Sequence, residues 1–137
     1  MRALRWPRLW LALYWLLLLA LVVVCVIPAP PDPLPLRHSD KFYHLLGYAL
    51  LAGFTVQLFA APALWPRLCV LLAFGVALEG VQWLLPWRSA DALDAVANAL
   101  GVGVGALLSF TPLARALQWV EARMPLRSAA RGERTLR

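Results

Sequence analysis

Charged residues are scarce in this chain, and their scarcity excludes most classes of soluble protein. Only 15% of the 137 residues are charged, whereas 62% are hydrophobic. Soluble globular domains carry about 25% charged and 45–50% apolar residues. The mean hydropathy of +0.70 points the same way. The composition therefore excludes a disordered protein and an ordinary soluble domain, and it predicts a small membrane protein with several spans.

Cysteine is also scarce, because the chain holds only Cys25 and Cys69. So few cysteines exclude a disulfide-rich secreted module. We expect Cys25 near the outer end of the first hydrophobic span and Cys69 near the inner end of the third. A disulfide requires Cα atoms within about 7 Å of each other, so no intramolecular bridge is expected.

Acidic residues are few as well, with 7 against 13 basic residues and a net charge of +6. The basic residues gather at the two ends of the chain, in residues 1–8 and 112–137. They flank hydrophobic spans, which is typical of membrane topology rather than of a nucleic-acid groove. We therefore expect no nucleic-acid partner, and the positive-inside rule places both termini in the cytoplasm.

Four hydrophobic runs are long enough to cross a bilayer. The first, Leu9–Ile27, is an unbroken apolar run of 19 residues, or about 28 Å of helix, and it ends at a proline-rich segment. The other three spans are expected at residues 42–61, 68–85 and 92–110. An even number of spans agrees with two cytoplasmic termini. The fold class is predicted as all-α, with a four-transmembrane-helix bundle in residues 1–111.

A short amphipathic helix is expected after the fourth span. Thr111-Pro112 has the residue types of a helix start. Four apolar residues then recur on one helix face: Leu113, Leu117, Val120 and Met124. This pattern predicts an interfacial helix on the membrane surface. A loose basic tail is expected from Arg127 onward, so that residues 112–137 form a cytoplasmic appendage.

The polar residues of the spans are predicted to meet at one membrane depth. An ionisable group near the bilayer centre costs at least about 2.5 kcal/mol, so its position is informative. Spans two and four enter the membrane from outside and span three leaves to the outside. The polar residues lie at those three outer ends: Lys41, His44, Tyr48, Glu79, Gln82, Arg88, Asp91, Asp94 and Asn98.

The spacing in the fourth span strengthens this prediction. Asp91, Asp94, Asn98, Gly101 and Gly105 fall on a single helix face. The two glycines form a small-xxx-small pair, which allows a neighbouring helix to approach closely. We therefore expect this face to point into the bundle rather than toward lipid.

The ordered set of polar motifs resembles the VanZ-like family of small bacterial membrane proteins. The residues that carry the resemblance are Asp40-Lys41-x-x-His44-x-x-x-Tyr48, Glu79-x-x-Gln82 and Arg88-Ser89-x-Asp91-x-x-Asp94-x-x-x-Asn98-x-x-Gly101-x-x-x-Gly105. The resemblance covers roughly residues 9–110. It implies a helical bundle in the bacterial cytoplasmic (inner) membrane, and the founding member is associated with resistance to teicoplanin. It does not supply an established reaction.

The outer polar residues suggest either chemistry or binding at the envelope side. His44 can act as a general base with Glu79 or Asp94 as its orienting carboxylate. Lys41 and Arg88 can hold a phosphate or carboxylate headgroup. The remaining binding residues are expected to be Gln82, Asp91, Asn98 and Tyr48. The predicted ligand is a membrane lipid or a lipid-linked envelope precursor, and water or a substrate hydroxyl would be the nucleophile.

Other interpretations of the same residues remain open at this point. The site could bind a headgroup without chemistry, or dock a partner membrane protein. The polar cluster could instead be an interhelical structural network that fixes the order of the helices. A divalent cation at His44, Glu79, Asp91 and Asp94 is opposed by the nearby Lys41 and Arg88, so no metal or cofactor is expected. Both a monomer and an oligomer are compatible with the sequence.

Overall fold

The computed structural model describes residues 1–28, 39–88 and 91–124, and it confirms the all-α prediction. No strand occurs in these residues. The elements are α1 (Pro7–Val26), α2 (Ser39–Leu58), α3 (Leu64–Leu84), α4 (Ala92–Leu107), two 3₁₀ turns (Leu108–Phe110 and Pro112–Arg115) and α5 (Ala116–Arg123).

Three helices are long and apolar enough to cross a membrane: Pro7–Val26, Leu64–Leu84 and Ala92–Phe110. They match the first, third and fourth expected spans with boundary shifts of at most four residues. The helix α2 has the length of a span but is less apolar, because it begins with Ser39-Asp40-Lys41 and carries His44. Lys41 and His44 belong to the expected polar site, so residues of that site contribute to the lower hydropathy of α2.

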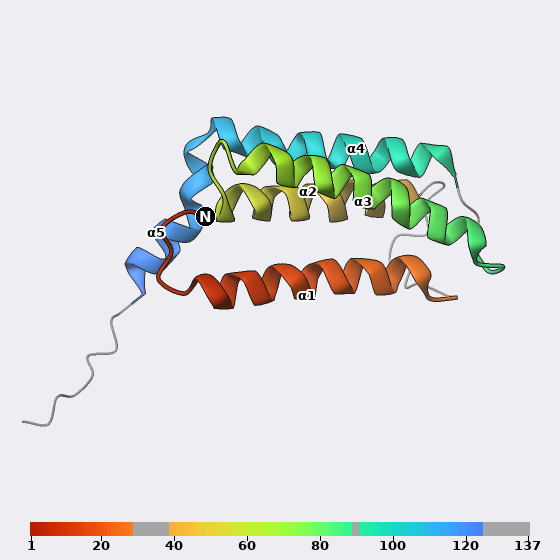
Figure 1. The fold of residues 1–137 in the computed structure, drawn as a ribbon, viewed down its shortest axis with the longest axis horizontal. Coiled ribbons are helices and arrows are strands. Elements are labelled where there is room, and N and C mark those ends of the chain that lie inside the picture. The colour runs from red at the N-terminus through yellow and green to blue at the C-terminus, as the bar shows by residue number, and fades with distance from the viewer. Residues whose placement is uncertain (29–38, 89–90, 125–137) are drawn as a thin grey trace, which may run out of the picture.

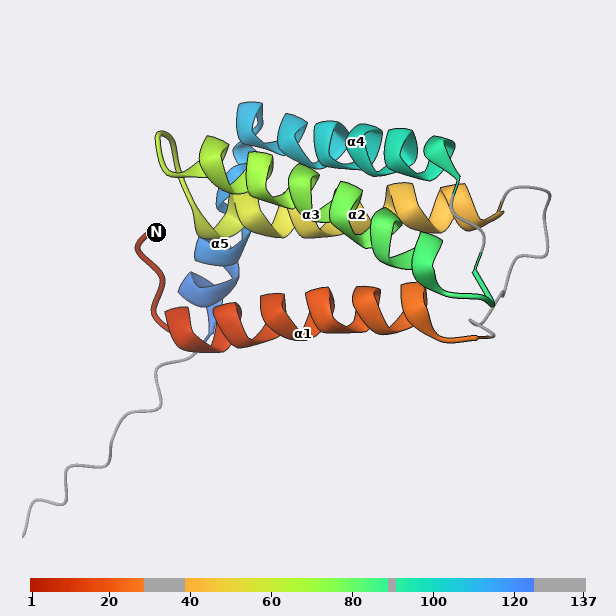
Figure 2. The same ribbon diagram turned by 45° about the vertical axis from the view of Figure 1, so that its right-hand side comes forward.

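The four long helices lie side by side, and α5 crosses one end of them (Figures 1 and 2). The central helix is α2, which contacts α1, α3 and α4 and packs most extensively against α4. We call the end where α1 begins, α2 ends and α5 lies the terminal end. The opposite end, where α2 and α4 begin and α1 and α3 end, is the distal end. The three expected groups of polar residues all belong to the distal end.

The pairing of α2 with α4 depends on the predicted glycine face. A Cβ atom at Gly101 would clash with the carbonyl oxygen of Leu45, and one at Gly105 would lie 2.5 Å from that of Ala49. Gly103, on another face, has nothing within 4 Å of the same position. The face that carries Gly101 and Gly105 therefore points into the bundle, as predicted, and it lets the two helix backbones meet.

Helix α1 packs more loosely, but its distal end is fixed by side chains of α3 and the segment after it. Gln82 donates from Nε2 to the carbonyl oxygen of Cys25 at 3.0 Å. Trp87 donates from Nε1 to the carbonyl oxygen of Val26 at 2.9 Å. Carbonyls in the last turn of a helix have no partner within the helix, so these bonds cap α1. Cys25 is buried and Cys69 is exposed, and both thiols are free.

The segment after α4 differs in detail from the expected amphipathic helix. Residues Pro112–Arg115 form a 3₁₀ turn, and only Ala116–Arg123 are α-helical. Leu113 and Val120 of the predicted apolar face are exposed, whereas Glu121 is buried against the protein. The predicted basic tail lies outside the described residues.

Candidate polar site at the distal end

Lys41, the only lysine of the chain, joins the start of α2 to the start of α4. Its ammonium lies 2.6 Å from a carboxylate oxygen of Asp91, 3.0 Å from Asp94 and 3.1 Å from Asp40. Asp91 also caps α4, because its side chain accepts a hydrogen bond from the Leu93 amide at 2.9 Å. The ammonium is therefore already neutralised by carboxylates and is not free to hold an anionic headgroup.

His44 lies one turn further along α2 and is buried. Its Nδ1 is 3.0 Å from Oδ1 of Asn98 on α4. In the tautomer that donates from Nδ1 to this amide oxygen, the lone pair lies on Nε2. That nitrogen is 4.0 Å from a carboxylate oxygen of the buried Asp94, beyond hydrogen-bond distance. The imidazole is thus held by Asn98, with Nε2 facing a carboxylate.

Glu79 ties α3 to the start of α4 through the backbone. Its Oε1 accepts a hydrogen bond from the Asp91 amide at 2.7 Å. Its Oε2 is buried and has no hydrogen-bond partner within the described part of the chain. Of the two carboxylates expected to orient His44, Asp94 is the one that the structure places beside the ring.

Tyr48 lies deeper in the bundle and is fully buried. Its ring packs against Gly75 of α3, where a Cβ atom would lie 3.1 Å from Cε1 of the tyrosine. Glycine at position 75 therefore makes the space that the tyrosine ring occupies. The phenol oxygen lies 3.2 Å from the same Cβ position.

Unpartnered buried polar atoms concentrate at this site. In the described segments, five buried side-chain polar atoms make no hydrogen bond, and four belong to predicted site residues: Tyr48 OH, Glu79 Oε2, Gln82 Oε1 and Asn98 Nδ2. The fifth is the hydroxyl of Ser109. Proteins pair about 90% or more of their buried polar groups, and each exception calls for an explanation. The site therefore presents two acceptors, one donor and one hydroxyl without a hydrogen-bond partner in residues 1–28, 39–88 and 91–124.

Arg88 follows α3 and is half-buried. Across the described residues, its guanidinium makes no hydrogen bond or ion pair with a protein side chain, while its backbone amide bonds to the Leu85 carbonyl. It is thus a cation that no carboxylate of the described chain neutralises. A planar guanidinium with free donors suits bidentate contact with a phosphate or carboxylate.

The structure brings most of the predicted residues together. Direct contacts join Lys41, His44, Asp91, Asp94 and Asn98. Glu79 joins them through the Asp91 amide, Gln82 bonds to α1 and Tyr48 lies deeper. Over residues 1–28, 39–88 and 91–124, no group of three or more His, Cys, Asp or Glu side chains could hold a metal ion. Ser89 of the motif lies outside the described residues.

Glu121 is a buried polar residue that the sequence did not single out. It is 2% exposed and lies at the terminal end. Its Oε2 accepts from the Arg5 amide at 2.6 Å, and its Oε1 accepts from the Trp6 amide at 3.0 Å and Trp10 Nε1 at 2.7 Å. The only available signal was a lone acid in a basic, apolar segment.

These bonds set the ionisation of Glu121. Burial raises the pKa of the carboxyl, but the hydrogen bonds donated by Arg5, Trp10 and Trp6 outweigh burial and hold the pKa below its ordinary value. The group therefore remains a carboxylate that fixes the start of α1 to α5.

No protein-family model matches the chain, and no curated protein or solved structure matches it.

Proposed function

We propose that this chain is a VanZ-like protein of the bacterial cytoplasmic membrane that binds the headgroup of a cell-envelope lipid or lipid-linked precursor. The binding site is the distal polar site at the ends of α2, α3 and α4. One observation carries the proposal: four buried polar atoms without a hydrogen-bond partner in the described chain belong to residues of the distal polar site. A buried polar group left unpaired costs about 1–3 kcal/mol, which favours a ligand as the reason for keeping it.

The proposal includes four membrane spans with both termini in the cytoplasm. Support comes from α2, which has 20 residues and lies among the three apolar helices (Figures 1 and 2). Its contacts with α1, α3 and α4 shield its polar residues from lipid. The arginines of residues 1–8 lie at the terminal end, as the positive-inside rule requires of a cytoplasmic face.

The free groups of the site suit a phosphorylated headgroup that also carries hydroxyl or amide groups. Arg88 supplies the cation for the phosphate, since Lys41 is neutralised by Asp91 and Asp94. The unpartnered oxygens of Glu79 and Gln82 accept hydrogen bonds from hydroxyl or amide donors. The unpartnered amide nitrogen of Asn98 donates one.

The position of His44 supports acid–base chemistry on such a ligand. The free Nε2 takes a proton from water, whose oxygen forms a bond to the outer phosphorus of a phosphoanhydride. The bridging P–O bond breaks, and the imidazolium returns its proton to the solution or to the departing phosphate. Asp94, 4.0 Å away, stabilises the imidazolium while it carries the proton.

The test uses a short-chain polyprenyl diphosphate as the probe, with protein reconstituted in phosphatidylcholine vesicles. Binding and phosphate release are measured for the wild type, Arg88→Gln, His44→Ala and the control Arg8→Gln. We expect Arg88→Gln to weaken binding about tenfold, the loss typical of one charge-assisted contact. His44→Ala should bind normally without releasing phosphate. Wild-type protein that neither binds nor hydrolyses the probe would contradict the proposal.

A second test addresses the orientation. In a Cys69→Ser background, Asp40→Cys marks the distal end and Ala60→Cys marks the terminal end. In intact cells, a membrane-impermeant maleimide should label the first variant only. Labelling of Ala60→Cys without permeabilisation would place the polar site on the cytoplasmic side and contradict the topology.

The second candidate function is an interhelical structural network in a non-catalytic scaffold or binding protein of the envelope. The observation that favours it is the Lys41 ammonium, which joins two helices through contacts with Asp91 and Asp94. A network of this kind loses stability when any member is neutralised. Stability measurements on the site residues therefore separate the two candidates.

A further inference from the structure

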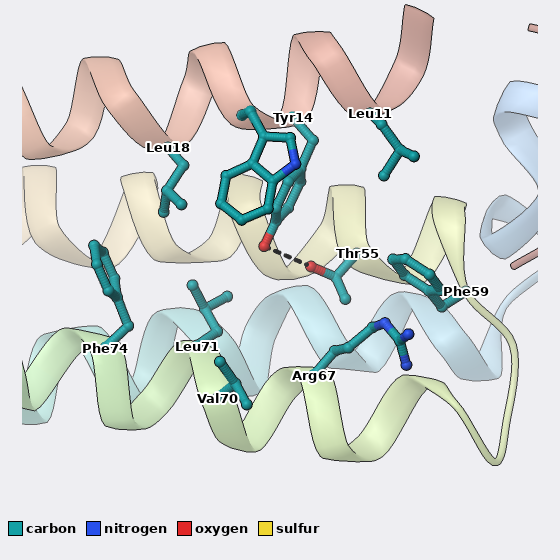
Figure 3. Close-up of a pocket in the computed structure, with 10 residues that line it drawn as sticks. Leu11, Tyr14, Leu18, Thr55, Phe59, Arg67, Val70, Leu71 and Phe74 are labelled. Carbon is teal, nitrogen blue, oxygen red and sulfur yellow. Dashed lines mark hydrogen bonds between the residues drawn. The ribbon is translucent and has the colours of Figure 1, made fainter. Parts of the chain in front are cut away.

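A cavity of about 310 Å³ lies between α1, α2 and α3, toward the terminal end (Figure 3). We propose that it binds one acyl chain of an anionic phospholipid, with the lipid phosphate on Arg67. The cavity is separate from the distal polar site, and the proposal does not depend on the function of that site.

The walls of the cavity are those of a hydrocarbon-chain site. Leu11 and Leu18 of α1 face Leu71 and Phe74 of α3 across the gap (Figure 3). The cavity runs along seven helical positions, or about 10 Å, which is roughly two-thirds of one bilayer leaflet. Its exposed edges, including Trp15 and Val70, are apolar and open toward the surface where lipid tails lie.

Arg67 provides the charge complementarity at the mouth of the cavity. It lies in the first turn of α3, and Figure 3 shows its side chain extending along the cavity toward Phe59. The guanidinium stacks on the Phe59 ring at 4.1 Å and donates one bond, 2.6 Å long, to the Ala63 carbonyl. Within the described residues it makes no ion pair, so its other donors are free for a phosphate.

A pair of hydroxyls lies on the cavity wall below the charge. The hydroxyls of Tyr14 and Thr55 are 3.4 Å apart, and Thr55 donates to the Leu51 carbonyl at 2.8 Å (Figure 3). When the single Thr55 proton goes to Leu51, the Tyr14 O–H can donate either to Thr55 Oγ1 or to an ester carbonyl, which lies below the phosphate in a glycerophospholipid. The order of groups along the cavity matches the order of groups in the lipid. Arg67 would meet the phosphate, Tyr14 the ester carbonyl and the apolar walls the hydrocarbon chain.

The capping of α1 explains why the cavity stays open. At the distal end Gln82 and Trp87 hold the last turn of α1, and at the terminal end Glu121 holds the first. A helix fixed at both ends cannot slide or tilt inward to close a gap along its middle. Packing alone would have closed such a gap, since protein interiors are densely filled.

A transmembrane helix about 10 Å in diameter has a volume of about 800 Å³ over the 10 Å length of the cavity, so a helix seated there would project beyond it. A single alkyl chain fits, and clusters of basic residues at the cytoplasmic ends of spans are known to recruit anionic lipids.

The experiment measures lipid retained by purified, delipidated protein after addition of phosphatidylglycerol, phosphatidylcholine with the same chains, or glycerol 3-phosphate. Native mass spectrometry counts the bound molecules. The variants are Arg67→Gln, which removes the phosphate contact, and Leu18→Trp, which fills the cavity. Arg8→Gln is the matched control, because it removes one exposed arginine of the same end that does not line the cavity.

We expect one tightly retained phosphatidylglycerol, weaker phosphatidylcholine and no retention of glycerol 3-phosphate. Arg67→Gln should weaken retention about tenfold, Leu18→Trp should abolish it and Arg8→Gln should leave it unchanged. Equal retention of both lipids, or an unchanged Arg67→Gln, would overturn the proposal. So would a dimer that Leu18→Trp dissociates, because the cavity would then be a contact between two copies of the chain.

Discussion

The two ends of the bundle both bury charged side chains, but they treat them differently. At the terminal end, both oxygens of Glu121 accept hydrogen bonds, and the donors are Arg5, Trp6 and Trp10. At the distal end, Glu79, Gln82, Asn98 and Tyr48 each keep a buried polar atom without a partner in the described chain. Buried polar groups that support the fold are as a rule paired. The difference supports a structural role for Glu121 at the terminal end and the proposed ligand binding at the distal end.

The largest effect is expected at the terminal end. Glu121→Ala removes the acceptor of three hydrogen bonds and leaves their donors unpaired, which should lower the free energy of unfolding by about 3 kcal/mol. The measurement is unfolding in mixed micelles with increasing SDS. Gln118→Ala, which loses one bond to the Ala3 carbonyl, is the control and should lose less. A Glu121→Ala protein as stable as the wild type would remove the contrast between the two ends.

The second effect concerns the helix pair that carries the distal site. Gly105→Ala forces a Cβ atom against the backbone of Ala49, and overpacking of this kind costs about 1–3 kcal/mol. The matched control is Gly103→Ala, where the Cβ meets nothing and the better helix propensity of alanine adds up to about 1 kcal/mol. Unfolding of the two variants under the same conditions provides the test. Equal stabilities would mean that α2 and α4 do not pack as closely as described.

The third prediction uses the lowered pKa of Glu121. Because the pKa is lower in the folded state, the carboxylate contributes stability above its unfolded pKa, and that contribution is lost as the pH falls toward the folded pKa. Unfolding free energies measured between pH 7 and pH 3 should decline in the wild type. The decline should be smaller in Glu121→Gln, which has no proton to gain. Identical pH profiles of the two proteins would contradict an ionised Glu121 that accepts hydrogen bonds from Arg5, Trp6 and Trp10.

The smallest effect is expected from Glu79→Gln at the distal end. The amide oxygen of glutamine can still accept the hydrogen bond from the Asp91 amide. The other carboxylate oxygen of Glu79, which the substitution replaces, has no hydrogen-bond partner in the described chain. We expect the free energy of unfolding to change by less than about 1 kcal/mol, while binding of the diphosphate probe falls. A loss as large as that of Glu121→Ala would favour the structural network over a binding site.

The contrast between the ends also shows what a sequence can reveal. The distal residues were predictable because alternating topology brings Lys41, Glu79 and Asp94 to one depth, and helical spacing gives the inward face. The neutralisation of Lys41 was not predictable, since it depends on side-chain distances across two helices. Glu121 was missed because its partners are more than 100 residues away and two of them are backbone amides.

The fold was predicted to a similar degree. Long apolar runs gave α1, α3 and α4 within four residues. The three-residue shift of α2 and the short α5 depend on capping and tertiary contacts, which periodicity does not record. The cavity beside Arg67 had no sequence signal, because its lining comes from three helices and depends on how they pack.

The most direct test of the central claim is the free energy of unfolding of Tyr48→Phe. This substitution removes only the hydroxyl, which is fully buried and has no partner in the described chain. If the distal polar atoms are kept for a ligand, Tyr48→Phe should be more stable than the wild type by about 1 kcal/mol in the absence of ligand. A loss of stability of similar size would show that the hydroxyl supports the fold, and it would contradict the assignment of the distal end to binding.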